Sequence, residues 1–132
     1  MSSLKEFFNT KDQLARHMGI EVLQAEEGYA VAQMELRSEH TNGLDMAHGG
    51  AIFTLADLAF AAASNARGRP AVAVNVNISF IKAVYSGLLR AEARETSLGN
   101  KLATYTVNVY DQAEDLCALF QGMVYRKKKK KS

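Results

Sequence analysis

The chain has 132 residues, and its shares of apolar (48%) and charged (23%) residues are typical of a single compact globular domain. The formal net charge is +2, but the five lysines at positions 127–131 leave the remainder at −3, which gives no electrostatic footprint for binding nucleic acid. One cysteine excludes an intramolecular disulfide, and no apolar stretch reaches the ~20 residues that cross a membrane.

Apolar residues near the N-terminus recur at helical spacing and predict an amphipathic helix over residues 4–18, ended by Gly19. The same segment carries charges throughout and has no apolar core like that of a secretory signal. Together with the single cysteine, this leads us to expect a cytoplasmic protein. Strand-like segments over residues 20–25 and 29–36 follow, on either side of a turn at 26–28.

The least ordinary segment covers residues 49–68 and follows a polar loop, residues 37–48. Its alanine content favours a helix over a strand. Because the segment is apolar on nearly every side, we expect it to be buried on nearly every side. Gly68 and Pro70 are expected to end the helix.

Four strand-like segments complete the pattern, and they cover residues 71–80, 88–96, 102–111 and 116–125. Turn-forming residues separate each segment from the next, which indicates consecutive hairpins in an antiparallel sheet. The order of helix, two strands, long helix and four strands predicts the α+β class. A curved sheet wrapped around the central helix would bury that helix on most sides.

Asp57 lies in the middle of the apolar helix, and no lysine or arginine within the helix could pair with it. An unpaired buried carboxylate is unfavourable, and burial raises its pKa. Ionisable groups in apolar clefts are candidates for functional sites. Asp57 is therefore a candidate catalytic residue, with the alternative that it caps or hydrogen-bonds a neighbouring loop.

His48, Gly49 and Gly50 begin the same helix. The first N–H groups of a helix have no partner within it, and the helix dipole there favours negative charge. Glycines also let a ligand approach the backbone closely. These features could form an oxyanion site for acyl transfer, although two glycines before a helix could also serve only a tight turn.

Gly49 and Asp57 are eight residues apart, which places them about 12 Å apart along one helix. They cannot both contact one carbonyl carbon from the same chain. A second copy of the helix, running antiparallel, could bring Asp57 to the Gly49 of its partner, and twofold symmetry would give two equivalent sites. The sequence therefore suggests an obligate dimer with shared active sites.

Other groups of residues do not indicate a metal site, a reactive thiol or a nucleotide-binding motif. His40, Asp45 and His48 do not have the spacing of a zinc site, so we expect no metal. Cys117 has no activating neighbour and is interpreted as a core thiol. The sequence contains neither a phosphate-binding loop nor a dinucleotide fingerprint.

Three short motifs resemble the signature of hotdog-fold thioesterases of the phenylacetic-acid-degradation (PaaI) group: Asn42-Gly43, His48-Gly49-Gly50 and Phe53-Thr54-Leu55-Ala56-Asp57. The spacing of Asn42, His48 and Asp57 is specific to this signature. The resemblance covers nearly the whole chain and includes the segment at 118–122 in the last expected strand.

The resemblance implies a single hotdog fold, in dimers that often pair again into tetramers. It implies hydrolysis of acyl-CoA thioesters, commonly with aryl-acetyl or other bulky acyl groups, and no cofactor, because coenzyme A is part of the substrate. Asp57 matches the catalytic carboxylate, as nucleophile or general base. Gly49 matches the backbone donor to the thioester carbonyl, and His48 and Asn42 match supporting polar groups.

Gly50, Phe53, Thr54 and Asn75 are expected to contact the substrate. Phe53 and Phe60 could form one apolar wall for the acyl group. Asn75 is a polar candidate near a position where some relatives carry a catalytic serine and this chain has Ala73. Lys82 and Ala83 stand where the family often has an arginine–proline pair, so the family's coenzyme A contacts cannot be transferred to that turn.

Two alternative functions stay open, a hotdog dehydratase using His48 and Asp57, and an acyl-CoA-binding sensor without turnover. We expect residues 1–126 to form the domain and residues 127–132 to form a disordered basic tail. The alternative for the tail is contact with an acidic partner, such as the phosphates of coenzyme A. We expect no binding to nucleic acid or to a membrane.

Overall fold

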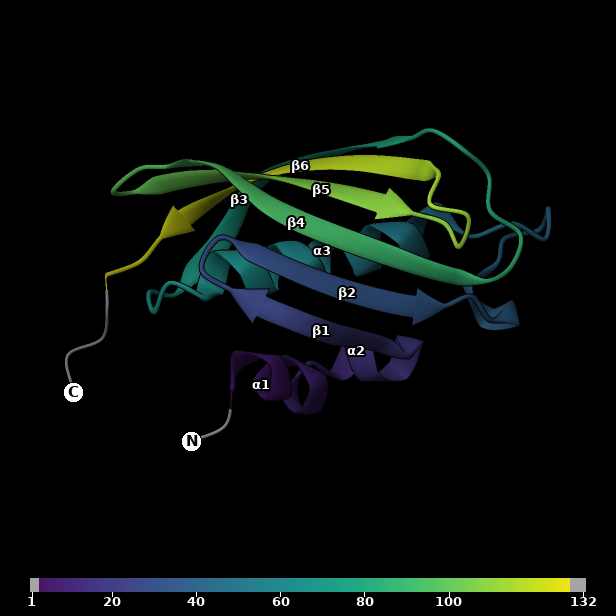
Figure 1. Ribbon diagram of the computed structural model, residues 1–132, viewed down its shortest axis with the longest axis horizontal. Coiled ribbons are helices and arrows are strands. Elements are labelled where there is room, and N and C mark those ends of the chain that lie inside the picture. Colours follow the sequence, from purple (N-terminus) through teal and green to yellow (C-terminus); the bar gives the residue numbers. More distant parts are fainter. Residues whose placement is uncertain (1–2, 129–132) are drawn as a thin grey trace.

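The computed structural model describes residues 3–128, in which six antiparallel strands form one curved sheet against a long helix, α3 (Figure 1). The strand order is β1-β2-β4-β5-β6-β3. The strands are β1 (Ile20–Glu26), β2 (Tyr29–Glu35), β3 (Ala71–Phe80), β4 (Leu88–Leu98), β5 (Leu102–Tyr110) and β6 (Leu116–Arg126). Each strand lies within a few residues of its predicted position, and the α+β class is confirmed.

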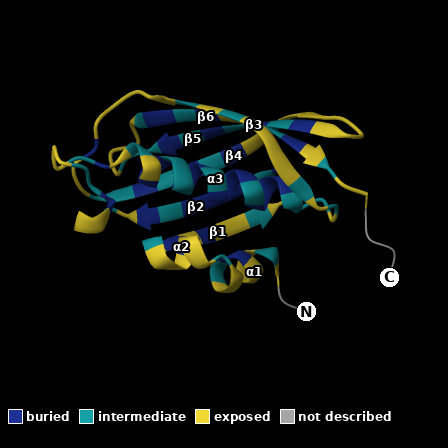
Figure 2. Ribbon diagram, turned by 180° about the vertical axis from the view of Figure 1, so that it is seen from behind, coloured by how far each residue is buried: buried dark blue, intermediate teal, exposed yellow. Residues whose placement is uncertain are grey.

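The helix α3 (Gly49–Asn65) packs on the concave face of the sheet, here called the inner face. Small residues on both partners let the backbones approach closely, for example Ala59 on the helix and Ala32 and Ala91 on the sheet, all fully buried. Figure 2 shows that much of α3 is buried. Gly122 leaves the space that the Phe60 ring fills, because a Cβ there would lie 2.6 Å from the Phe60 Cζ.

The N-terminal segment forms two helices, α1 (Leu4–Lys11) and α2 (Gln13–Met18), where the sequence predicts one. The break is at Asp12, whose extended backbone ends α1 and whose side chain accepts a hydrogen bond from the Ala15 N–H at 3.0 Å. An aspartate at an N-cap competes with helix continuation in this way. Gly19 ends α2 in the left-handed conformation (φ 72°), as predicted.

The prediction of consecutive hairpins is wrong between β3 and β4. β3 pairs with β6 at the edge of the sheet, whereas β4 lies between β2 and β5, so residues 81–87 cross from one to the other. The crossing is fixed by backbone hydrogen bonds from Ala47 to Val84 (2.7 Å) and from Leu36 to Gly87 (2.9 Å). Alternation along a strand does not specify its neighbours, and the consequence here is that β3 has one free edge.

A short 3-10 helix, η1 (Ser38–His40), lies in the loop before α3. At the other end of the chain, β6 ends at Arg126, and Lys127 still donates its N–H to the Pro70 carbonyl. The domain boundary after residue 126 stays a prediction. Positions 129–132 of the predicted tail lie outside the described residues. Within residues 3–128, no helix is long and apolar enough to cross a membrane.

Candidate active site

A pocket of about 310 Å³ opens at the N-terminal end of α3. The loop before α3 and the first turn of the helix form one side, and the end of β3 with the crossing segment forms the other. Its lining residues are Asn42, Met46, Ala47, Gly49, Ile52, Phe80, Ile81, Lys82, Ala83 and Val84. The pocket therefore brings together two of the predicted catalytic residues, Asn42 and Gly49.

The backbone amides at the start of α3 are not equivalent. His48 is the N-cap, and its Nδ1 accepts a hydrogen bond from the Gly50 N–H at 2.8 Å. The amides of Ala51 and Ile52 donate to the His48 carbonyl at 2.9 and 3.2 Å. Within the described chain, the Gly49 N–H has no acceptor, so it is the amide of this group that can polarise a ligand.

Gly49 is also the position where the backbone lies open to the pocket. A Cβ at this position would lie 3.0 Å from the Cζ of Phe80, whose ring is 55% exposed at the end of β3. The ring therefore forms an apolar wall directly beside the free amide. The sequence pattern contained no sign of this contact, because the two residues are 31 positions apart.

Asn42 contributes a donor to the same pocket. Its Oδ1 accepts hydrogen bonds from the backbone N–H groups of Leu44 (2.9 Å) and Met46 (3.4 Å), which closes the loop as an Asx-turn. The side-chain carbonyl is thereby fixed, while the Nδ2 group has no acceptor among the described residues. Asn42 can therefore donate to a ligand without giving up its role in the loop.

Asp57 lies on the third turn of α3 and forms neither a hydrogen bond nor an ion pair within residues 3–128. Burial, followed by the negative charge of Asp12 on the N-terminal helices, raises its pKa above the ordinary value. The alternative that Asp57 caps a loop finds no bond to support it. The proximity of Asp12, 45 positions earlier, is a feature that the sequence did not reveal.

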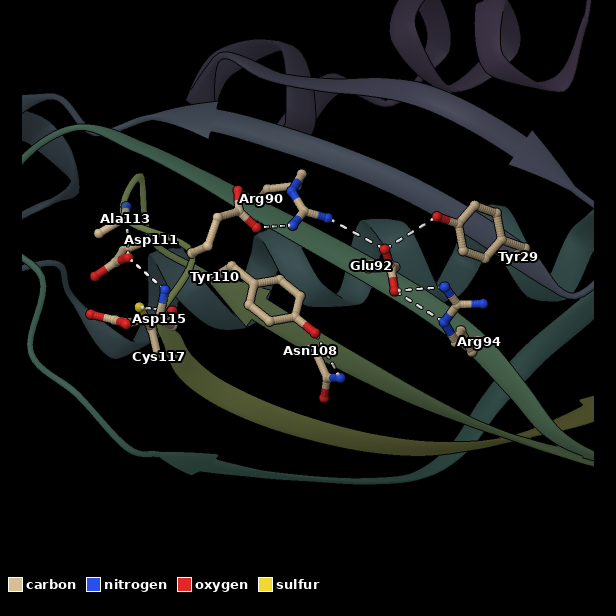
Figure 3. Close-up of polar contacts among 11 residues, drawn as sticks. Tyr29, Arg90, Glu92, Arg94, Asn108, Tyr110, Asp111, Ala113, Asp115 and Cys117 are labelled. Atoms are coloured by element: carbon tan, nitrogen blue, oxygen red, sulfur yellow. Dashed lines mark hydrogen bonds and ion pairs between the residues drawn. The ribbon is translucent and has the colours of Figure 1, made fainter.

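Partly buried carboxylates on the sheet are neutralised, which distinguishes them from Asp57. On the outer face of the sheet, Glu92 accepts hydrogen bonds from Arg90, Arg94 and Tyr29 (Figure 3). Glu95 accepts two hydrogen bonds from Arg67, each 2.9 Å long. The chain therefore supplies cations to carboxylates on the sheet and leaves the one on the central helix without a partner.

Asp57 belongs to a stripe on α3 that the sheet does not cover. Gly50, Thr54, Asp57 and Ala61 recur at helical spacing and are partly or fully exposed, although the helix is otherwise buried. The Thr54 hydroxyl donates to the Gly50 carbonyl at 2.8 Å, so it is bonded within its own helix. The expectation of burial on nearly every side is therefore wrong for this stripe in the single chain.

Phe53 and Phe60, the two rings expected to form the apolar substrate wall, lie in different surroundings. The half-buried Phe53 ring packs against Phe120 with 5.5 Å between ring centroids. Phe60 is 1% exposed and packs against Tyr105, Phe120 and the Gly122 backbone. The interpretation of Phe60 as part of a substrate wall is wrong, because its ring lies in the core.

Asn75 does not join the pocket in this chain. It pairs with Met123 in the register of β3 and β6, and it lines a separate hollow on the outer face with Asn77, Thr104 and Gln121. Asn42 and Gly49 lie beyond the end of the same strand. Asn75 is therefore apart from the other predicted site residues.

Lys82, at the position of the family's arginine, is held by two carboxylates. Its Nζ lies 2.7 Å from the Asp111 Oδ2 and 2.7 Å from the Asp115 Oδ2, both in the β5–β6 turn, and these contacts raise its pKa. The ammonium fastens the crossing segment to that turn. It forms part of the pocket wall, but its charge is already neutralised.

The histidine and cysteine outside the pocket have structural roles. His40 is 2% exposed, its Nδ1 accepts from the Arg37 N–H at 2.9 Å, and its Nε2 donates to the Met18 carbonyl at 2.8 Å. Cys117 is fully buried, as predicted, and burial raises its thiol pKa. In the part of the chain that is described, no group of three His, Cys, Asp or Glu side chains could hold a metal ion.

Comparison with known proteins finds related sequences and structures. Residues 44–118 match the family profile described as Thioesterase superfamily. A putative esterase of Archaeoglobus fulgidus is 46% identical over 124 residues (93% of this chain, 80% of the relative), and the acyl-coenzyme A thioesterase PaaI of Escherichia coli is 35% identical over 116 residues (87% and 83%). The solved structure of the E. coli PaaI protein superposes with a TM-score of 0.90 at 32% identity, covering 96% of this chain and 98% of that one.

Proposed function

The chain belongs to the thioesterase superfamily as a thioester hydrolase of the PaaI-like hotdog type, and we propose that it hydrolyses acyl-CoA thioesters with aryl-acetyl or other bulky acyl groups. The observation that carries this proposal is the unpaired carboxylate of Asp57, on the one stripe of α3 that the sheet leaves open. The similarity to thioesterases indicates thioester hydrolysis, and the Asp57 carboxylate is the group proposed to perform it.

We further propose that two copies of the chain share each active site. The rise of an α-helix places Gly49 and Asp57 about 12 Å apart in one chain. β3 offers a free edge with exposed apolar side chains, Val74 being 54% exposed, and strand edges of this kind pair readily. A twofold axis beside β3 would align the two β3 strands and the two α3 helices antiparallel, and the dimers could pair further into tetramers.

In the proposed reaction, the thioester carbonyl lies at the N-terminus of α3. The Gly49 N–H and the helix dipole stabilise the negative charge that develops on the carbonyl oxygen. Asn42 donates through its Nδ2 group. His48, whose Nδ1 is occupied, offers its Nε2 N–H to the attacking water or to the sulfur.

The partner's Asp57 takes one of two roles. As general base it removes a proton from water, the water oxygen attacks the carbonyl carbon, and the carbon–sulfur bond breaks to release the thiolate of coenzyme A. As nucleophile it attacks the carbon itself, the thiolate leaves, and water then hydrolyses the anhydride. The raised pKa of Asp57 makes its carboxylate a stronger base than an exposed aspartate, which suits either role.

The pocket supports the proposed substrate preference. Its lining is mainly apolar, with Ile52, Phe80 and Val84 around the site, and its volume suits an acyl group larger than acetyl. The half-buried Phe53, next to Thr54 of the open stripe, is proposed to extend this surface at the dimer interface.

Release of free thiol from a panel of acyl-CoA thioesters tests this function. Phenylacetyl-CoA should have a kcat/KM at least about tenfold above that of acetyl-CoA, because burying a phenyl ring contributes roughly 1.5–3 kcal/mol. A higher value for acetyl-CoA would contradict the preference for bulky groups. Tight binding without thiol release would instead indicate a sensor, and loss of water from a hydroxyacyl-CoA would indicate a dehydratase.

A further inference from the structure

A second pocket, of about 310 Å³, lies at the opposite end of the sheet from the candidate active site. It is lined by residues of the loop after α3, the β4–β5 turn and the end of β6, and Figure 1 shows these segments at the same end of the sheet. Its lining residues are Arg69, Asn100, Lys101, Tyr125, Arg126 and Lys128, here called the basic pocket. Four of these six side chains are cations, and the Tyr125 ring is 43% exposed among them.

Neutral groups position the cations of the basic pocket. The Arg69 guanidinium donates to the carbonyls of Lys127 (2.9 Å), Asn100 (3.0 Å) and Arg126 (3.1 Å). The Arg126 guanidinium donates to the Gly99 carbonyl at 2.7 Å. These bonds fix the geometry of the pocket and leave its positive charge in place.

Elsewhere in the molecule, arginines and lysines that pack against the sheet are neutralised by carboxylates. Arg67, Arg90 and Lys82 each form ion pairs with aspartate or glutamate. Within residues 3–128, none of the four cations of the basic pocket forms such a pair. The pocket is therefore the place where concentrated positive charge is unmatched.

The sequence separates charge in the same way. The chain has a net charge of +2, and eight cations belong to the basic pocket and to the lysine run at 127–131, so the rest of the chain has a net charge of −6. A local excess of positive charge attracts anionic ligands. The four described cations of the basic pocket, with no carboxylate paired to them, therefore suit a polyanionic ligand.

The proposed dimer brings the two pockets together. Within one chain they lie near opposite ends of β3, and nine residue steps from Ala71 to Phe80 span about 30 Å. Antiparallel pairing of two β3 strands places the Ala71 end of one chain beside the Phe80 end of the other. Each basic pocket would then lie near the mouth of the partner's candidate active site.

We propose that the basic pocket binds the phosphate groups of the nucleotide part of an acyl-CoA thioester whose acyl group lies in the partner's active site. This inference rests on the proposed function and on the proposed dimer. Ammonium and guanidinium groups form charge-assisted hydrogen bonds with phosphates, and Lys101, Lys128 and Arg126 have donors to offer. The exposed Tyr125 ring provides a surface on which the adenine can stack.

The test compares two substrates with and without the nucleotide, phenylacetyl-CoA and the phenylacetyl thioester of N-acetylcysteamine. The double variant Lys101→Gln/Lys128→Gln should raise KM for phenylacetyl-CoA about tenfold, or about 1.4 kcal/mol, as expected for two exposed charge pairs. Its kcat should stay unchanged, and so should its KM for the truncated thioester. The control Lys11→Gln/Arg16→Gln removes two exposed charges from α1 and α2 and should change neither KM.

Titration calorimetry with adenosine 3′,5′-bisphosphate separates this inference from the proposed function. Weaker binding of this probe by the double variant supports the basic pocket even if the wild-type protein hydrolyses neither thioester. An unchanged bisphosphate affinity together with an unchanged KM for phenylacetyl-CoA would overturn the inference. Tight binding of a single-stranded oligonucleotide at this pocket, with the bisphosphate not bound, would also overturn it in favour of nucleic acid.

Discussion

At the scale of single residues, the surroundings of Asp57 distinguish it from the other partly buried carboxylates that have a cationic partner. Glu92, Glu95 and Asp111 are also partly buried, and each has an arginine or lysine partner. Asp57 has no partner within the described chain, and both burial and Asp12 oppose its charge. The centre of the helix thus holds a carboxylate whose surroundings disfavour its charged state. This is the arrangement expected of a reactive carboxylate.

The variant Asp57→Asn should lower kcat for thioester hydrolysis at least about a hundredfold, the low end of contributions from acid–base catalysis. Asparagine keeps the size of the side chain and could replace aspartate as a cap, so a merely structural Asp57 would show only a modest loss. A folded variant that keeps more than about a third of wild-type activity, far above that low end, would rule out a catalytic role.

The same variant makes a prediction about stability. Because the pKa of Asp57 is raised in the folded state, the folded protein binds the Asp57 proton more tightly than the unfolded chain does. The protonated group therefore contributes to the free energy of unfolding below the unfolded-state pKa. This contribution is lost as pH rises through the folded-state pKa. At pH 7, Asp57→Asn should therefore melt at the same or a higher temperature than wild type. The difference should shrink in acid, and thermal melts across pH measure it.

At the scale of helices and strands, the sequence predicted most of the architecture. Strand positions follow from alternation, as in Tyr105, Val107 and Val109, and α3 follows from its alanine content. Asp57 stood out because a charged residue in an apolar helix is visible in one dimension, and Gly49 because glycines begin that helix. Asn42, in a polar loop, was found only through the resemblance to the family signature. The position of β3 beside β6 could not be read from the sequence, because it depends on contacts between distant segments. The break at Asp12 is a local capping contact with Ala15 that the apolar spacing of residues 4–18 does not reveal.

The break between α1 and α2 allows a separate test, because it brings Asp12 near Asp57. The variant Asp12→Asn keeps an N-cap side chain for α2 and removes the negative charge. The pKa of Asp57 should then fall, so the acidic limb of the profile of kcat/KM against pH should shift to lower pH. The variant Glu39→Gln, which removes an exposed charge from η1, serves as the control, and an equal shift there would contradict a local effect.

At the scale of the whole molecule, the features of the proposed site lie in three separate parts of one chain. Gly49 and its pocket lie at one end of the helix, Asp57 lies on an open stripe further along, and the basic pocket lies at the far end of the sheet. A twofold axis perpendicular to β3 at its free edge would bring all three features to one substrate. Each active site would then take residues from two chains.

Mixed dimers of two inactive variants test that claim most directly. One chain carries Asp57→Asn and the other carries Gly49→Pro, which removes the free N–H at the first helical position, where proline is tolerated. Gly49→Ala, which keeps the N–H and adds only a Cβ, controls for crowding against Phe80. Each variant alone should be nearly inactive in thiol release.

When the two chains are denatured together and refolded, half of the dimers are mixed, and a shared-site dimer then has one site with both native residues. The account predicts recovery of about a quarter of wild-type activity, because one site in four is intact under twofold symmetry. If each active site were built from a single chain, mixing would restore nothing, and activity that stays at the level of the separate variants would contradict the account.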